Sequence, residues 1–259
     1  MLLEGKVAVV SGLGPGMGRD ISLALAREGA DIVMAARREK RMARVAEEIA
    51  ELGRESLSVP TDITDRASCD ALAAAVVERF GKADILVNNA FSDGTYTSFE
   101  DSDLDAWRAT FDVNYFGTLQ LTQALLPVLK KQDDTRIIMI NTMSTQMIER
   151  NFGAYAASKA ALATSTKTLA LELGKYGVRV NGIHPGYIWG KSVEWYFNDQ
   201  AEKRGIPFQE VYDEIADQTC LGYIPSSEEI AGAVVFFASP LSKPITGQAL
   251  SVNAGHFLP

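Results

Sequence analysis

Tyr155 and Lys159 stand four residues apart in the stretch YAASK. Residues at this spacing share one face of a helix. A tyrosine hydroxyl has an unperturbed pKa of about 10, and a neighbouring ammonium lowers that pKa by stabilising the phenolate. The pair could therefore act as a general acid and base near neutral pH. Taken alone the spacing is weak evidence, because an amphipathic helix with one aromatic residue and one solvated lysine looks the same.

A glycine-rich loop, SGLGPGMG at 11–18, follows the first apolar run of the chain. Glycine lets the backbone take positive φ and approach a phosphate closely, and the helix that follows directs free N–H groups at an anion. The common fingerprint G-x-G-x-x-G does not fit, because the glycine it needs after Gly12 and Gly14 is replaced by Met17. The loop predicts nucleotide binding, and a tight structural turn is the alternative.

The end of the second apolar run bears on which dinucleotide binds. The stretch MAARR places Ala36 where an acidic residue would bind the ribose 2′-OH of NAD, with Arg37 beside it. A guanidinium pairs bidentately with phosphate, so Arg37 favours the 2′-phosphate of NADP(H) over NAD(H). The alternative is that Arg37 and Arg38 simply begin a solvated basic helix.

Short apolar runs alternate with longer amphipathic segments and supply the elements that must position these residues. The expected strands are 6–10, 31–36, 56–60, 83–90, 136–141, 178–186 (with its exit loop) and 248–253. The expected helices are 17–28, 38–52, 65–80, most of 103–131, 153–175 and 226–238. This alternation predicts an α/β fold with a doubly wound parallel sheet of about seven strands and helices on both faces. With no linker or repeat in view, we expect a single domain over 1–259.

Composition excludes several classes of function. The net charge of -8 argues against nucleic acid or an anionic membrane as a general partner. The two cysteines, Cys69 and Cys220, have no paired spacing, and the N-terminus lacks the pattern of a signal peptide, so we expect a cytoplasmic protein. The two histidines, His184 and His256, do not stand at metal-ligand spacing, and no metal site is expected.

Together the motifs resemble those of the short-chain dehydrogenase/reductase family over essentially the whole chain. In family order they are Gly12-x-x-x-Gly16-x-Gly18, Asp62 in TDIT, NNA at 88–90, Asn114 in FDVNYFG, Tyr155-x-x-x-Lys159, and NGIHPG at 181–186. Several motifs in order are far more specific than any one of them. The resemblance implies a Rossmann-type fold, hydride transfer between NAD(P)(H) and a secondary alcohol or ketone, and a homotetramer or homodimer.

The resemblance also implies roles for individual residues. Tyr155 transfers the proton to or from the substrate oxygen, Lys159 lowers the tyrosine pKa and binds the nicotinamide ribose, and Asn114 holds a water that links Lys159 to solvent. The expected cofactor-binding residues are Ser11, Gly12, Gly16, Met17, Gly18, Arg37, Asp62, Ile63, Asn89, Ala90, Tyr155, Lys159, Pro185, Gly186 and Ile188.

Three positions depart from the family pattern. The serine usually found thirteen residues before the tyrosine is Thr142 here, and Ser144 is the alternative donor to the substrate oxygen. Phe91 replaces the glycine that usually follows NNA, and Gly190 replaces a threonine after the Pro-Gly pair. None of these changes removes the tyrosine and lysine.

The segment 189–222, which we call the lid segment, is rich in aromatic residues and corresponds to the family's substrate lid. Apolar walls suit a bulky, hydrophobic or cyclic substrate, although half or more of these side chains could instead anchor the segment's own helices or a subunit contact. Two rival functions stay open. One is a cofactor-binding sensor or scaffold without turnover, and the other is NAD-dependent dehydrogenation of a cis-diol.

Overall fold

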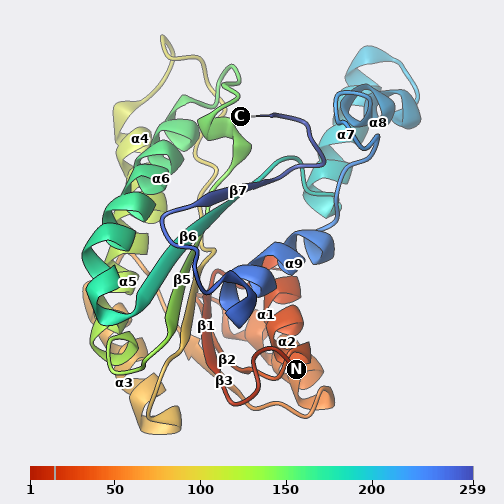
Figure 1. Cartoon of the computed structure of the whole chain (residues 1–259). Coiled ribbons are helices and arrows are strands. Elements are labelled where there is room, and N and C mark those ends of the chain that lie inside the picture. The colour runs from red at the N-terminus through yellow and green to blue at the C-terminus, as the bar shows by residue number, and fades with distance from the viewer. Residues whose placement is uncertain (15, 259) are drawn as a thin grey trace.

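The computed structural model describes residues 1–14 and 16–258. Seven parallel strands form one sheet in the order β3-β2-β1-β4-β5-β6-β7 (Figure 1). The strands are β1 (Val7–Ser11), β2 (Asp31–Ala36), β3 (Ser56–Pro60), β4 (Ile85–Asn88), β5 (Thr135–Ile140), β6 (Val178–Pro185) and β7 (Ala249–Val252). The predicted doubly wound parallel sheet of about seven strands is confirmed.

Helices cover both faces of this sheet, with α1, α2 and α9 on one side and α3, α5 and α6 on the other (Figure 1). Their bounds are α1 (Met17–Arg27), α2 (Glu39–Glu51), α3 (Arg66–Phe80), α4 (Leu104–Phe111), α5 (Thr118–Leu129), α6 (Gly153–Leu173), α7 (Lys191–Arg204), α8 (Phe208–Ala216) and α9 (Ser227–Ala238). Between α4 and α5 the chain forms a π-helical segment, η1 (Asp112–Gly117), inside the region expected to be helical. In the described part of the chain, no helix is both long and apolar enough to cross a bilayer.

The strands read as unbroken apolar runs because both faces of the sheet are buried. Successive side chains of β5 point to opposite faces, so Ile138 and Ile140 join the core layer under α1 and α9, while Ile137 and Met139 join the layer under α3, α5 and α6. Every residue of β1 and of β5 is buried. This two-sided core fixes the sheet and leaves the carboxyl ends of its strands to carry a site.

The lid segment has a small core of its own. Phe197 of α7 is fully buried, and its ring lies within 6.5 Å of those of Trp189, Phe208 and Tyr212. Four of the six aromatic residues of the lid segment therefore pack mainly against one another, which is the alternative in which they anchor the segment's own helices. The other two, Trp195 and Tyr196, are 69% and 43% exposed.

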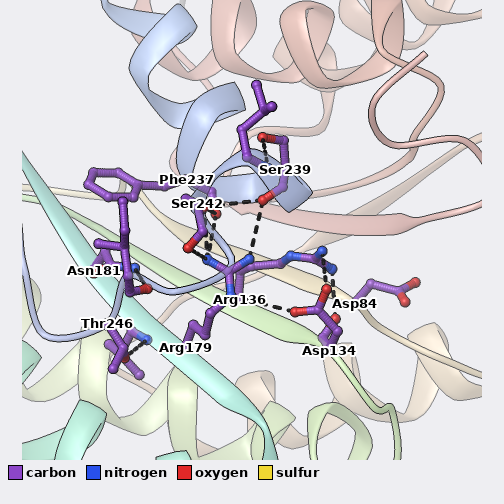
Figure 2. Close-up of polar contacts among 12 residues, drawn as sticks. Asp84, Asp134, Arg136, Arg179, Asn181, Phe237, Ser239, Ser242 and Thr246 are labelled. Atoms are coloured by element: carbon purple, nitrogen blue, oxygen red, sulfur yellow. Dashed lines mark hydrogen bonds and ion pairs between the residues drawn. The ribbon is translucent and has the colours of Figure 1, made fainter.

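A polar network lies at the amino ends of β5 and β6, on the side of the sheet away from the carboxyl ends of the strands (Figure 2). Arg136, only 2% exposed, pairs with Asp134 at 2.6 Å, and Arg179 approaches the same carboxylate at 3.5 Å. The Arg179 guanidinium also donates to the Ser242 backbone carbonyl at 2.9 Å and to Ser239 at 3.3 Å. These bonds tie the segment after α9 to the central strands.

We expect Asp134→Asn to destabilise the fold, because it leaves the buried Arg136 guanidinium without its counter-charge. Hydrogen bonds to charged groups contribute about 2 kcal/mol, and chemical denaturation should show a loss of that order. The matched control is Asp70→Asn, which breaks the exposed i,i+4 pair with Arg66 and should cost less than about 0.5 kcal/mol. Equal losses in the two variants would contradict a structural role for the network.

Candidate active site

The glycine loop leaves β1 at the point where the strand order reverses, between β1 and β4. This is the position where open α/β sheets bind ligands. Gly12 has φ of +79°, and a Cβ there would lie 2.5 Å from the Ala90 Cα. A Cβ at Gly18 would lie 2.2 Å from the Gly12 carbonyl oxygen. Both positions therefore require glycine for the loop to pack against the end of β4.

Side chains from β1 and from the loop after β4 hold this turn in place. The Asn89 amide Nδ2 donates to the Gly12 carbonyl at 2.7 Å and to the Ser11 carbonyl at 3.2 Å. The Ser11 hydroxyl accepts hydrogen bonds from the backbone N–H of Asn89 at 3.1 Å and from the backbone N–H of Ala90 at 3.3 Å. These four predicted cofactor residues thus lie together, and each helps to shape the loop.

The loop has room for an anion. A Cβ at Gly14 or Gly16 would meet no described atom within 4 Å, and α1 begins at Met17 with no side-chain cap at Gly16. The first amides of a helix have no partner within the helix, so they can bind phosphate oxygens. The chemistry and space fit a pyrophosphate, and Gly12, Gly16, Met17 and Gly18 would hold it.

Arg37 and Asp62 lie near each other beyond the ends of β2 and β3. The Asp62 carboxylate accepts from the Thr64 amide at 3.0 Å and from the Thr64 hydroxyl at 2.7 Å. These bonds lower the pKa of Asp62, and the positive charge of Arg37 lowers it further. Arg37 is exposed and forms no ion pair with any described residue. A guanidinium is therefore free to meet a ligand at this end of the site.

The remaining predicted cofactor residues follow β3 and β6. Ile63 is 7% exposed and lies against η1, since a Cβ at Gly117 would come within 2.9 Å of its side chain. Pro185 ends β6, and a Cβ at Gly186 would lie 2.8 Å from Asn253. Ile188 is half-buried against the core layer under α1 and α9. These residues lie on the same edge of the sheet as the glycine loop.

Tyr155 lies in the first turn of α6, with Thr142 beside its hydroxyl. Burial around this hydroxyl raises the pKa of Tyr155 to about 12, while the Thr142 side chain acts in the opposite direction. The sequence led us to expect a lowered pKa from Lys159. That expectation is wrong for the protein alone, because the Lys159 ammonium is engaged elsewhere and the buried hydroxyl is held in its neutral form.

Lys159 is 2% exposed, and its Nζ donates to the Ile140 carbonyl at the end of β5 at 2.8 Å. No carboxylate pairs with it among the described residues, and burial lowers the pKa of Lys159 to about 7. The ammonium is thus fixed by the last residue of a central strand. It lies on the tyrosine's helix, one turn further on.

Asn114 lies in η1, and its side chain is fully buried. Its Oδ1 accepts from the Ser92 amide at 2.7 Å, and its Nδ2 donates to the Ser92 carbonyl at 2.8 Å and to the Ser158 hydroxyl at 3.0 Å. Its own carbonyl accepts from the Thr118 hydroxyl at 3.0 Å. The π-helical turn places this side chain between the loop after β4 and the catalytic helix, an arrangement often found at functional sites.

Thr142 and Ser144 were the two candidate donors to the substrate oxygen. The Thr142 hydroxyl donates to the Ser144 hydroxyl at 3.2 Å and caps the short turn η2 (Met143–Thr145) by accepting from the Ser144 amide. Of the two, Thr142 is the one whose side chain acts on the pKa of Tyr155. Ser144 is 5% exposed and contacts Thr142.

Two aromatic rings pack against the ring of Tyr155, and a third packs on one of them. Phe91 lies edge-on at 6.3 Å between ring centroids, and Phe152 lies at 5.1 Å. Tyr96 packs on Phe152 at 5.0 Å, and its hydroxyl donates to Asp93 at 3.1 Å. We did not predict Phe152 or Tyr96 from the sequence. Phe152, the residue just before α6, stands three residues before Tyr155, and that spacing was the available signal.

A glycine loop that can hold an anion, with a half-buried tyrosine and a buried lysine at the same ends of the strands, is typical of a nucleotide-dependent oxidoreductase. A family model described as "Enoyl-(Acyl carrier protein) reductase" matches residues 12–256. The chain belongs to the short-chain dehydrogenase/reductase family. It is accordingly an NAD(P)-dependent oxidoreductase acting on CH–OH or C=O groups.

Two curated relatives and two solved structures illustrate the family. The chain is 30% identical over 253 residues to the 7alpha-hydroxysteroid dehydrogenase of Escherichia coli K12, covering 98% of this chain and 94% of the relative. It is 36% identical over 258 residues to the trans-4-hydroxycyclohexanecarboxylate dehydrogenase of Sinomonas cyclohexanicum, covering 96% and 92%.

Among solved structures, the L-sorbose reductase of Gluconobacter frateurii, complexed with NADPH and L-sorbose, is similar with a TM-score of 0.93 at 29% identity. The alignment covers 99% of this chain and 98% of that one. An NAD+-bound xylitol dehydrogenase is similar with a TM-score of 0.90 at 28% identity, covering 97% and 99%. The two structures were solved with different nicotinamide cofactors.

We expect Gly18→Ala to destabilise the protein even without cofactor, because the added Cβ collides with a backbone oxygen. Overpacking of this kind costs about 2 kcal/mol, which corresponds to a fall in Tm of about 5 °C for a chain of this size. Gly14→Ala is the matched control in the same loop, since its Cβ meets open space, and its Tm should stay near that of the wild type. Similar Tm values for both variants would contradict this packing.

Lys159→Met tests whether the ammonium is buried without a counter-charge. The pKa of Lys159 is about 7 in the folded chain against an ordinary value of 10.5, so between these values the unfolded chain binds more protons and wild-type stability rises with pH. We expect the variant to melt above the wild type at about pH 6 and the difference to shrink towards pH 10. A difference that grows with pH would contradict this reading.

Proposed function

We propose that this oxidoreductase interconverts a secondary alcohol and a ketone with Tyr155 as the proton donor and acceptor. The Thr142 hydroxyl beside that of Tyr155 carries the proposal, because the two hydroxyl groups together can bind one substrate oxygen. Such a pair suits a carbonyl or hydroxyl group better than a carbon–carbon double bond. The curated relatives, which are named for hydroxylated substrates, support the same choice.

The chain's own residues divide the work as follows. The neutral Tyr155 hydroxyl donates its proton to the carbonyl oxygen during reduction and takes it back during oxidation. Thr142 orients that oxygen, and Lys159 lies one helical turn away as the nearest buried cation. Bound NAD(P)(H) supplies or accepts the hydride. Asn114 fixes the start of the catalytic helix through Ser158, and we retain its predicted part in a water relay as a proposal.

A bulky, hydrophobic or cyclic substrate is the class that the surroundings of Tyr155 favour. Phe91 and Tyr96 are 60% and 59% exposed, so they present apolar surface beside the catalytic ring. We place these side chains and Phe152 ahead of the lid segment as the wall that selects the substrate, since most of the lid segment's aromatic rings pack against one another. We still infer that the lid segment, 189–222, covers the site.

A polyol is the second candidate substrate. The observation that favours it is the similarity to structures of a xylitol dehydrogenase and an L-sorbose reductase, and it extends our earlier alternative of a cis-diol. Asp93 and the Tyr96 hydroxyl could accept hydrogen bonds from further substrate hydroxyls. Of the rival functions, a scaffold without turnover has the weaker support, because the buried Lys159 and the Tyr155–Thr142 pair are all in place.

We infer a preference for NADP(H) over NAD(H), and the support is the exposed Arg37 near Asp62. We also propose a single catalytic domain over 1–259, a cytoplasmic location and a homotetramer or homodimer. Exposed apolar side chains on α4, η1 and α6, namely Leu104, Phe116 and Leu171, support association of subunits.

Tyr155→Phe removes the proton donor but keeps the ring. We expect kcat to fall by about a thousandfold or more, with the Kd for the cofactor nearly unchanged. Thr142→Ala should lower kcat more than Ser144→Ala, because Thr142 lies beside the tyrosine hydroxyl. Stopped-flow and steady-state absorbance of NAD(P)H measure both effects. Wild-type rates in Tyr155→Phe would refute the proposed mechanism, and the reverse order for the other two would make Ser144 the donor.

Arg37→Ala tests the cofactor preference. A guanidinium on the 2′-phosphate forms charge-assisted hydrogen bonds, so we expect affinity for NADPH to fall by about tenfold or more and affinity for NADH to change little. Arg38→Ala is the matched control on the neighbouring exposed arginine. Fluorescence titration of the wild type and both variants with both nucleotides gives six dissociation constants, and an equal loss of affinity for NADH and NADPH in Arg37→Ala would contradict the preference for NADPH.

A further inference from the structure

His184 lies near the end of β6, is 5% exposed, and takes part in no step described above. Side chains of a strand alternate between the faces of the sheet. Val178 and Val180 belong to the core layer under α5 and α6, so His184 points to the same face. This is the face on which α6 carries Tyr155 and Lys159.

The contacts of His184 lead directly to the turn that carries Thr142. Its Nδ1 lies 3.1 Å from the Thr145 hydroxyl, and that hydroxyl donates to the Thr142 carbonyl at 3.0 Å. A hydroxyl group has one proton to donate. Because the Thr145 hydroxyl gives its proton to Thr142, it can only accept from the imidazole. His184 must therefore carry its proton on Nδ1.

The other nitrogen of the ring supports the same tautomer. Nε2 is buried and has no hydrogen-bond partner among the described residues. A proton on Nε2 would be a buried donor without an acceptor, which is rarer and more costly than an unused acceptor. A doubly protonated ring is disfavoured too, because burial and the charges of Lys159 and Lys167 lower the pKa of His184.

The hydrogen bonds that connect His184 with Thr142 begin where the backbone hydrogen bonds between β5 and β6 end. The Asn141 amide still donates to the Ile183 carbonyl at 2.9 Å, and the chain then leaves β5 and turns into η2. The bonds from His184 to Thr145 and from Thr145 to Thr142 continue the connection between the two strands beyond that point. They fix the backbone carbonyl of Thr142, whose side chain lies beside the Tyr155 hydroxyl.

We propose that His184 is a positioning residue, which holds the η2 turn through Thr145 so that the Thr142 hydroxyl meets Tyr155 and the substrate oxygen. This rests on the proposed function. His184 itself touches neither substrate nor cofactor in this scheme. Its effect should appear in kcat rather than in cofactor affinity.

Two pairs of matched variants test the link by steady-state kinetics, with the alcohol or ketone that the wild type turns over fastest among steroids, cyclic alcohols and polyols. Loss of one positioning hydrogen bond should lower kcat about tenfold. We expect this from His184→Ala and from Thr145→Val, with the cofactor Kd unchanged. His184→Asn keeps an N–H donor at the Nδ1 position and Thr145→Ser keeps the hydroxyl, so both should recover most of the lost kcat.

A double-mutant cycle checks that the two residues act as one unit. The variant carrying both His184→Ala and Thr145→Val should lose no more than the worse single variant. Losses that multiply, or wild-type kcat in His184→Ala, would overturn the proposal. If His184→Ala does not fold, the comparison of Thr145→Val with Thr145→Ser decides in its place, and equal kcat in those two would likewise overturn it.

The tautomer gives a readout that does not depend on turnover. The chain has two histidines, so a His256→Gln variant assigns the side-chain nitrogens of His184 in ¹⁵N NMR spectra. We expect a protonated Nδ1 and an unprotonated Nε2, and a proton on Nε2 would overturn the proposal. If the wild type turned over no alcohol or ketone, the proposed function would fail, while this spectrum would still decide whether the His184–Thr145 bond exists as drawn.

Discussion

The burial of Lys159 is the constraint on which the rest of the site depends. An ammonium that is 2% exposed loses its hydration, and among the residues that the structure describes only the Ile140 carbonyl at the end of β5 accepts a hydrogen bond from it. That bond requires α6 to lie across the carboxyl end of a central strand. The helix in turn brings Tyr155 over η2 and Thr142. A destabilised cation is thus tolerated at the place where the chemistry needs one.

The amino and carboxyl ends of the strands have different roles. At the amino ends of β5 and β6, Asp134, Arg136 and Arg179 connect the chain after α9 to the sheet (Figure 2). At the carboxyl ends of the strands, loops carry most of the functional groups, and side-chain hydrogen bonds hold these loops in place of the backbone hydrogen bonds between strands. Asn89 holds the glycine loop in this way, and Asn114 holds the start of α6. The buried sheet therefore supports a set of loops at the carboxyl ends of its strands, and individual polar contacts set the geometry of these loops.

Much of the fold could be predicted from the sequence, because apolar runs of about five residues between amphipathic segments are typical of a parallel sheet covered on both faces. The ends of helices could also be predicted: the helix expected at 65–80 is α3, and it ends at Gly81, which takes the left-handed conformation. The π-helical turn at Asn114 could not be predicted, because the residues DVNYFG continue a helical pattern. The wider turn is favoured by tertiary contacts of Asn114 with Ser92 and Ser158.

The candidate site was predictable in its residues and less so in its electrostatics. Spacing suggested Tyr155 and Lys159, and the resemblance to the family added Asn114, but both led us to expect that the lysine lowers the tyrosine's pKa. Burial raises that pKa instead, and the surroundings of the ring include Phe91 and Tyr96, which lie about sixty residues earlier in the chain. The aromatic residues of the lid segment misled in the same way, since composition does not reveal which rings pack on one another.

Transfer of deuterium tests the central claim most directly. A secondary alcohol labelled at its carbinol carbon would be incubated with NADP+ or NAD+ and the protein, and the reduced nucleotide examined by NMR. The account predicts deuterium at C4 of the nicotinamide, on a single face, in the wild type and its absence in Tyr155→Phe. A reduced nucleotide carrying only solvent protons, or none formed from any secondary alcohol in a panel of steroids, cyclic alcohols and polyols, would contradict it.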